Sequence, residues 1–409
     1  MRPLPPLIFL LGVAGASARL GVSADLLQAR SSRDEGCRCF PGDACWPNPQ
    51  DWAEFNSTLG GKLVATLPIG SSCHDGPHGS FDAARCTHIQ SSWGFPETHY
   101  RTSSSVQSAF FANDSCDPFL PRSAPCALGT YVRYAVDARS AADYQSTLAF
   151  SRRHNLRLVI RNTGHDYLGK STGAGALALW THHLKGIRVL DYQSSAYSGK
   201  ALKAGAGVQV SEAQAAAHAE GLVVVGGNCE SVGLAGGYTQ GGGHGPLSST
   251  FGLSADQVLE WEAVTAEGRH LVATPGNNSD LYWALSGGGG GTYAAVLSVT
   301  VKAYPDVRIA AANLTFTPDG VSTDAFYGAV QTFLTNLPAL LDIGASSVWL
   351  LTGGIFLMQP TLAPGLTKES LQKLIDPTLA KLNESGMPYS KWVSHPLYIA
   401  DGSESVLYR

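Results

Sequence analysis

Charged side chains are scarce in this sequence. Only 15% of the 409 residues are Asp, Glu, Lys or Arg, and the net charge is −4. So weak a charge gives no basic field of the kind that attracts nucleic acid. Long apolar runs are missing too, because no segment has the roughly 18 uninterrupted apolar residues that cross a bilayer. We therefore expect neither nucleic acid nor a membrane as a partner.

Other familiar patterns are also absent. The 46 glycines show no collagen period, and no Gly-x-Gly-x-x-Gly with a downstream acid supports a Rossmann dinucleotide site. The Cys37-x-Cys39 pair lacks the second half of a zinc site. The adjacent His182 and His183 point apart on a strand, and no carboxylate lies at ligand spacing. We expect no metal site.

Apolar residues and glycine are what the chain has in quantity. At 44% hydrophobic residues it can bury the core of two or three domains. The glycines gather between residues 164 and 291. This clustering indicates loops that are shaped around a ligand.

The first 18 residues fit a secretory signal peptide. Arg2 precedes an apolar stretch over residues 7–13, and Ala16-Ser17-Ala18 fits a cleavage site. A buried N-terminal helix is the alternative. Five glycosylation sequons agree with secretion. They begin at Asn56, Asn113, Asn277, Asn313 and Asn383.

Seven of the eight cysteines lie in the first third of the chain. They are Cys37, Cys39, Cys45, Cys73, Cys86, Cys116 and Cys126. In an oxidising compartment this group indicates disulfides that hold an N-terminal extension over residues 19–124. Because seven is odd, either one of them stays free or it pairs with Cys229, which stands alone.

Strands and helices alternate from residue 125 to residue 306. Predicted strands cover 131–136, 156–160, 201–210, 222–225, 258–265, 270–273 and 295–302. Predicted helices cover 141–155 and 211–220, the second with Ser211 as its N-cap. The class is α+β.

Residues 307–409 show a different pattern of predicted helices and strands. Apolar residues at helical spacing between Phe326 and Leu337 predict a helix with one buried face. Strands are predicted over 347–351 and 355–358. A further helix opens at Thr367 and is interrupted at Pro377.

The motif Arg161-Asn162-Thr163-Gly164-His165-Asp166-Tyr167 directly follows a predicted strand. Backbone N–H groups of such a loop can form a nest for phosphate oxygens. His165 is expected to be exposed in the loop and to titrate near its ordinary pKa, so its neutral imidazole would be a competent nucleophile. A hydrogen-bonded loop histidine is the alternative.

The same place satisfies the P-loop spelling over residues 164–171. A P-loop must open a helix at once, but Thr172-Gly173-Ala174-Gly175 follows. Two glycines in four residues cost about 2 kcal/mol of helix propensity. We therefore disfavour a nucleotide triphosphatase.

A second glycine-flanked motif surrounds Cys229, whose thiolate could attack an electron-poor ring carbon. A structural thiol or a disulfide partner is the alternative. The passage over 233–245 is too glycine-dense for regular structure, which favours close backbone approach to a ligand. The turn over 287–291 is either a second such loop or a plain hairpin loop.

At these motifs, and at Gly241-Gly242-Gly243-His244-Gly245 and Asp280-Leu281-Tyr282-Trp283-Ala284-Leu285, the chain resembles the berberine-bridge-enzyme-like branch of the vanillyl-alcohol-oxidase (VAO) flavoprotein family. It is most similar to the fungal members, including those described as isoamyl alcohol oxidases and as FAD-linked oxidoreductases of secondary metabolism. The resemblance implies a PCMH-type, two-subdomain FAD-binding domain over 125–306 and an antiparallel-sheet substrate domain over 307–409. Because family members continue beyond the point matching Arg409, it also implies that the substrate domain is partial and the chain truncated.

The resemblance implies a bound FAD and gives roles to single residues. The histidine matching His165 carries the flavin through its 8α-methyl group, and in bicovalent members the cysteine matching Cys229 bonds C6. Tyr167 matches a position near the active site and is the candidate catalytic residue. The other candidate cofactor-binding residues are Arg161, Asn162, Thr163, Gly164, Asp166, Gly233, Gly237, Gly241 and Gly243.

The implied function is that of a secreted FAD-dependent oxidase of secondary metabolism. Its substrate would be an alcohol or a small hydroxyl- or amine-bearing metabolite that gives a hydride to flavin N5. Dioxygen would be the electron acceptor and hydrogen peroxide the product. A truncated, non-catalytic remnant of the FAD fold is the alternative.

Overall fold

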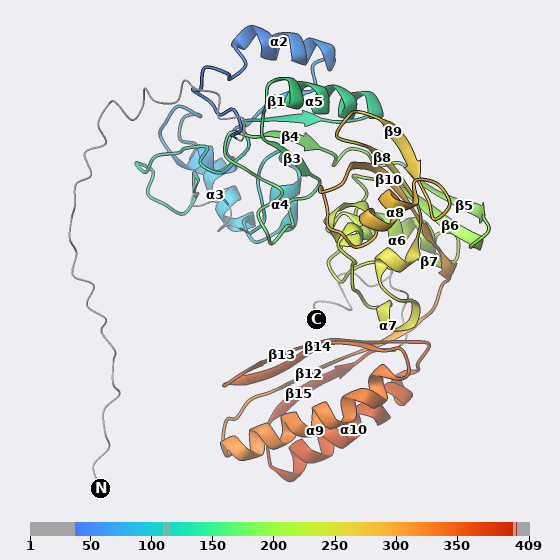
Figure 1. The fold of residues 1–409 in the computed structure, drawn as a ribbon. Coiled ribbons are helices and arrows are strands. Elements are labelled where there is room, and N and C mark those ends of the chain that lie inside the picture. Colours follow the sequence, from blue (N-terminus) through green and yellow to red (C-terminus); the bar gives the residue numbers. More distant parts are fainter. Residues whose placement is uncertain (1–36, 109–111, 113–114, 396–397, 399–409) are drawn as a thin grey trace.

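The computed structural model describes residues 37–108, 112, 115–395 and 398 (Figure 1). The expected signal peptide over 1–18, the sequon at Asn113 and the tail over 399–409 lie outside these residues. The three larger sheets of the described residues have four, five and four strands. Among the helices described, none has the length and apolar character that crossing a bilayer requires.

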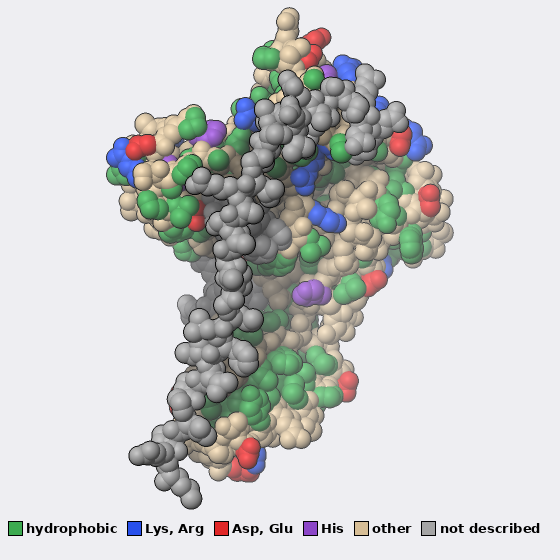
Figure 2. Space-filling model, turned by 60° about the vertical axis from the view of Figure 1, so that its left-hand side comes forward, with side chains coloured by type: hydrophobic (Ala, Val, Ile, Leu, Met, Phe, Trp, Pro, Cys, Tyr) green, Lys and Arg blue, Asp and Glu red, His purple; other side chains and the backbone are tan. Residues whose placement is uncertain are grey.

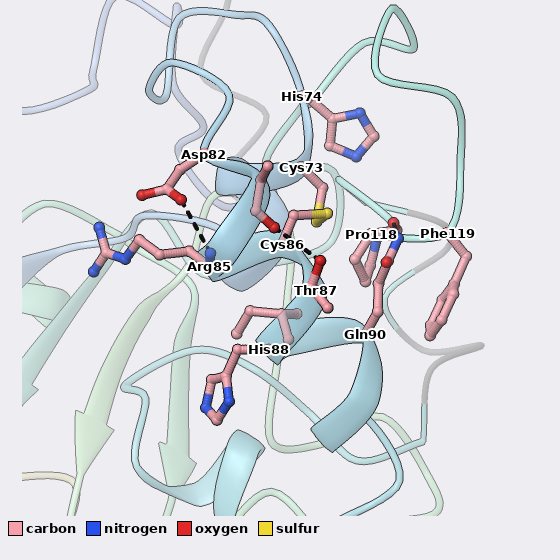
Figure 3. The surroundings of a disulfide bond; sticks show 12 residues. Cys73, His74, Asp82, Arg85, Cys86, Thr87, His88, Gln90, Pro118 and Phe119 are labelled. Carbon is pink, nitrogen blue, oxygen red and sulfur yellow. Dashed lines mark hydrogen bonds between the residues drawn. A yellow bond between two sulfur atoms is a disulfide. The ribbon is translucent and has the colours of Figure 1, made fainter.

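The described part of the Cys-rich extension contains short helices joined by loops. They are α2 (Pro49–Thr58), the 3-10 helix η1 (Ile69–Cys73), α3 (Ala83–Ser92) and α4 (Pro96–Tyr100). Disulfides join Cys39 to Cys45, Cys73 to Cys86 and Cys116 to Cys126. Figure 3 shows the bond that ties η1 to α3, close to the Asp82 cap of α3. The predicted disulfides are therefore confirmed, and Cys37 is the cysteine of this group that stays free.

The first sheet has the strand order β1-β2-β4-β3. Its strands are β1 (Leu63–Ala65), β2 (Tyr134–Asp137), β3 (Leu158–Arg161) and β4 (Leu177–Trp180). The last three are parallel, and α5 (Ala141–Arg153) connects β2 to β3. Strand β1 comes from the extension and pairs antiparallel with β2. Phe55 of α2 stacks on Phe150 of α5 at 4.0 Å between ring centroids, so extension and sheet share one core.

The second sheet is antiparallel, with the order β5-β6-β10-β8-β9. Its strands are β5 (Ile187–Gln193), β6 (Ser198–Gly205), β8 (Val258–Val264), β9 (His270–Ala273) and β10 (Ala295–Lys302). Helices α6 (Val210–His218) and α8 (Ser279–Leu285) pack against it around the fully buried Trp261. The short strands β7 (Leu222–Val223) and β11 (Tyr304–Pro305) pair nearby.

The predicted N-cap of α6 is wrong. Helix α6 begins at Val210, and Gln209 is its N-cap. The carboxylate of Glu212 accepts a hydrogen bond from the Gln209 N–H at 2.7 Å. This bond satisfies a donor just ahead of the first turn, so the helix starts two residues earlier than a Ser211 cap would place it.

The third sheet has the order β13-β14-β12-β15 and is antiparallel. Its strands are β12 (Ile309–Phe316), β13 (Ser346–Thr352), β14 (Ile355–Pro364) and β15 (Tyr389–Val393). Helices α9 (Thr323–Leu341) and α10 (Lys368–Glu384) cover one face of it (Figure 1). On the face drawn in Figure 2, apolar side chains gather on this part of the molecule, and charges of both signs are scattered.

The predicted interruption at Pro377 is also wrong, because α10 continues through it to Glu384. A proline inside a helix removes one hydrogen bond and costs about 3 kcal/mol. Ile375, Leu379 and Leu382 are buried in the core under the third sheet. Burying three such side chains offsets that cost at roughly 1.5–3 kcal/mol each.

Candidate functional site

The Arg161 loop leaves the carboxyl end of β3, where the parallel strand β4 ends beside it. Gly164 has a φ of +79°, a conformation that L side chains rarely adopt. Its carbonyl accepts a hydrogen bond from the Gln107 N–H at 3.1 Å. The extension therefore holds the turn that presents His165.

Arg161 lies under this loop and is only 1% exposed. Its Nη2 donates to the His99 carbonyl at 3.0 Å, while Nε and Nη1 have no partner among the described residues. Burial lowers the pKa of the guanidinium to about 9. A buried cation with two unused donors is costly by itself and suits a site that receives an anion.

Asn162 joins the loop to the glycine-rich passage. Its Nδ2 donates to the Ala206 carbonyl at 2.9 Å, and its Oδ1 lies 3.0 Å from Nδ1 of His182. An amide oxygen can only accept, so His182 donates from Nδ1. A Cβ atom on Gly233 would overlap the Asn162 amide. Asn162 and Gly233 thus fix the loop, and His182, considered in the sequence only as a metal ligand, supports Asn162.

His165 is half-buried, and its Nε2 lies 2.8 Å from the hydroxyl of Ser231. Burial, and then the nearby His99, lower the pKa of His165 to about 4. The expectation of an exposed imidazole with an ordinary pKa is therefore wrong. The ring is neutral at neutral pH, and it contacts the segment that carries Cys229.

Cys229 is a free, half-buried thiol, so the structure gives it no disulfide partner. Its carbonyl accepts the Val232 N–H at 3.3 Å in a tight turn. The neighbouring Asn228 has a buried Oδ1 without a partner in the described part of the chain. The Cys229 motif therefore ends in a compact turn beside His165.

The other loop residues have different surroundings. Thr163 is buried. Asp166 accepts from the N–H groups of Leu168, Lys170 and Ser171, which shapes the loop after His165. Tyr167 is 77% exposed at the loop tip.

The glycine-rich passage forms a cradle around the irregular helix η3 (Leu234–Tyr238). A Cβ atom on Gly237 would meet nothing within 4 Å, so open space lies over it. Gly241 packs on the Gly237 carbonyl, where a Cβ atom would come within 2.7 Å. Gly243 has a φ of +73°, and a Cβ atom there would lie 2.9 Å from the Tyr238 ring.

Gln240 draws the second glycine turn into this cradle. Its carbonyl accepts from the N–H groups of Gly287 and Gly289 at 3.0 and 2.8 Å. Its side-chain Oε1 is buried and unpaired among the described residues. The turn over 287–291 is thus bound to the glycine-rich passage, which favours the ligand-loop interpretation over a plain hairpin.

Comparisons with known proteins agree with this geometry. The family described as "FAD binding domain" matches residues 132–274. The chain is 52% identical over 389 residues to the FAD-linked oxidoreductase sor8 of Hypocrea jecorina (strain QM6a), covering 94% of this chain and 67% of that protein.

Two solved structures are similar over most of the chain. The VAO-type flavoprotein MtVAO615 of Myceliophthora thermophila C1 has a TM-score of 0.83 at 47% identity, covering 88% of this chain and 66% of that one. MtVAO713 of the same organism has a TM-score of 0.79 at 32% identity, covering 88% and 68%. This chain spans about two thirds of the length of these relatives. It therefore belongs to the FAD-linked oxidoreductases of the VAO type.

Proposed function

We propose that this protein is a secreted FAD-dependent oxidase whose flavin is attached covalently to His165. The observation that carries the proposal is the neutral, half-buried imidazole of His165 at the meeting point of the two glycine-flanked motifs. When bound, FAD would accept a hydride at N5 and pass the electrons to dioxygen.

The residues present fit FAD. Open space over Gly236 and Gly237 would admit the dinucleotide close to the backbone. The buried donors of Arg161, and the buried amide oxygens of Asn228 and Gln240, have no hydrogen-bond partner among the described residues, so the two motifs and the glycine-rich passage offer one cation and two acceptors. Such a set suits a pyrophosphate joined to a ring with polar edges.

His165 supplies the nucleophile for attachment. A neutral ring has one nitrogen with a free lone pair, and a pKa of about 4 keeps the ring neutral throughout the physiological range. His165 would hold the flavin through a bond from a ring nitrogen to the flavin methyl carbon. The imidazole and the methyl group would each give up one hydrogen, and dioxygen would accept both with their electrons as hydrogen peroxide.

Cys229 is proposed as the site of a second bond, to flavin C6. Its thiol is unpaired, and it belongs to the segment that contacts His165. Tyr167 is proposed to orient the substrate with its hydroxyl, since its ring stands exposed within the turn that Asp166 shapes. The substrate class is an alcohol or a small hydroxyl- or amine-bearing metabolite.

Secretion is supported by the three disulfides, because such bonds persist in oxidising compartments. Two of the sequon asparagines, Asn277 and Asn383, are exposed and accessible to a glycan. Asn313 lies inside β12 opposite Trp392.

The test is the flavin that stays on the protein after acid precipitation, followed by peroxide release on a panel of alcohols. We expect wild-type protein to remain yellow and His165→Ala to release its flavin on denaturation. Properly folded wild-type protein that stays colourless when supplied with FAD contradicts the proposal. Tethered flavin without peroxide on any substrate favours the non-catalytic alternative.

A further inference from the structure

We propose that Ser231 is a positioning residue for flavin attachment: its hydroxyl accepts the Nε2–H of His165 and so leaves Nδ1 as the ring nitrogen that bonds the flavin. This inference rests on the covalent attachment proposed above and adds a residue and an atom to it.

The geometry of the contact carries the first step. The Oγ of Ser231 lies 2.8 Å from Nε2 of His165, within the normal range of a hydrogen bond. Within the described part of the chain, Nδ1 of His165 has no hydrogen-bond partner. One edge of the ring is therefore engaged and the other is available.

The chemistry of a neutral imidazole carries the second step. Such a ring bears one N–H and one lone pair, and the hydrogen bond to one nitrogen decides which nitrogen carries the proton. With Nε2–H donating to the serine oxygen, Nδ1 holds the lone pair and is nucleophilic. If the serine hydroxyl donated to Nε2, Nδ1 would carry the proton and could not attack.

The rigidity of Ser231 carries the third step. Its carbonyl accepts from Nε2 of Gln209 at 3.0 Å. On either side, Val210 N–H donates to the Val232 carbonyl at 2.9 Å, and Ser211 N–H donates to the Glu230 carbonyl at 3.1 Å. Ser231 itself is 8% exposed. The backbone at Ser231 is therefore held by the start of α6, which limits where its buried hydroxyl can lie.

The experiment follows the formation of covalent flavin in full-length protein that was produced without riboflavin and is then supplied with FAD. Total bound flavin is measured by absorbance, and covalent flavin by in-gel fluorescence after denaturation. Ser231→Ala should bind FAD but attach it more slowly by about 10- to 100-fold, by analogy with the loss when the outer partner of a metal-ligating histidine is removed. Ser231→Thr, which keeps the hydroxyl, should restore most of the rate.

The matched control is Ser151→Ala. Ser151 in α5 is also buried, and its hydroxyl donates to the carbonyl of Leu156, just past the end of this helix, at 3.2 Å. It should attach flavin at the wild-type rate. A loss in both alanine variants would show that any buried hydroxyl matters, and it would overturn a special role for Ser231.

A second measurement covers the case in which Ser231→Ala folds poorly. Nitrogen-15 NMR of histidine-labelled wild-type protein without FAD should show His165 with its proton on Nε2, and a proton on Nδ1 overturns the inference. If wild-type protein forms no covalent flavin, the proposed attachment fails and the role of Ser231 with it. If wild-type protein and Ser231→Ala attach flavin equally fast, only the inference about Ser231 fails.

Discussion

The Nη2 of Arg161 lies 3.0 Å from the carbonyl oxygen of His99, so the Arg161 loop rests on helix α4 of the N-terminal extension. A second hydrogen bond between the extension and this loop runs from the Gln107 N–H to the Gly164 carbonyl. Two segments more than 50 positions apart thus build the base of the site together.

Replacing Arg161 with methionine should separate cofactor binding from folding. The change removes a buried cation with two unpaired donors, so the midpoint of thermal unfolding without FAD should change little or rise. Affinity for FAD should fall about tenfold or more, since a charge-assisted hydrogen bond contributes about 1.5–3 kcal/mol. The measurement is an FAD titration beside a melting curve, and unchanged affinity contradicts the role given to Arg161.

Two glycines of the cradle should respond differently to a methyl group. In Gly233→Ala the new Cβ would overlap the Asn162 amide, and the free energy of unfolding should fall by about 1–3 kcal/mol, as in overpacked cores. In Gly236→Ala nothing lies within 4 Å of the new atom, so stability without FAD should be nearly unchanged while FAD binding weakens. Denaturant unfolding and FAD titration of both variants test this, and equal effects of the two changes speak against a cradle.

His165 should make stability depend on pH. Its pKa is about 4 in the folded protein, below the unfolded value of 6.5, so between these values only the unfolded chain binds the proton. The stabilising contribution of the neutral His165 to the free energy of unfolding should be complete above pH 6.5 and should decrease as the pH falls towards 4. His165→Gln should reduce this slope, and replacing the exposed His88 should not. Urea unfolding of FAD-free protein from pH 7 to 4.5 is the measurement.

Cys229→Ser should change the flavin absorption spectrum and leave the flavin attached through His165 alone. The exposed free thiol Cys37 provides the control, because Cys37→Ser should leave the spectrum as it is. Intact-protein mass and absorbance after unfolding decide the matter. If spectrum and covalent yield are the same in wild-type protein and Cys229→Ser, the second bond does not exist.

Pro377→Ala should stabilise α10 and with it the part of the protein built on the third sheet. Proline interrupts the hydrogen bonding of α10 at an exposed position, so alanine should raise the free energy of unfolding by about 1–2 kcal/mol. Ala380→Pro in the same helix should lower it by about 3 kcal/mol. Thermal and denaturant unfolding give both values, and a destabilised Pro377→Ala would show that the native helix requires the proline.

Much of the fold could be predicted from local pattern. The predicted bounds of β9 and β10 are those observed, and α5 and α9 lie where apolar spacing placed them. Strand β12 was not predicted because Ala310, Ala311 and Ala312 have low strand propensity. Pairing on both sides with β14 and β15 overrides that preference. In β15, Lys391 interrupts the apolar alternation, and its amine reaches Gln372 of α10 instead.

The motifs of the candidate site could be predicted from the sequence, but the burial and the hydrogen-bond partners of their side chains could not. Gly164 and Asp166 on either side of His165 suggested exposure. Its actual burial comes from Ser231, 66 positions later, and from the extension around His99. Long-range cover of this kind leaves no mark in the local sequence. The support that His182 gives to Asn162 was hidden for the same reason.

The pairing of β1 with β2 limits how this protein can be cut into modules. The stretch that matches the FAD-binding family begins at residue 132, yet Val136 pairs with Leu63 and the Gly164 carbonyl bonds Gln107. A fragment that begins at residue 132 would leave the β2 edge of the first sheet unpaired. It would also lack the Gln107 N–H that bonds the Gly164 carbonyl. Transplanting the cofactor unit into another scaffold therefore requires the disulfide-bonded segment from residue 37 onward.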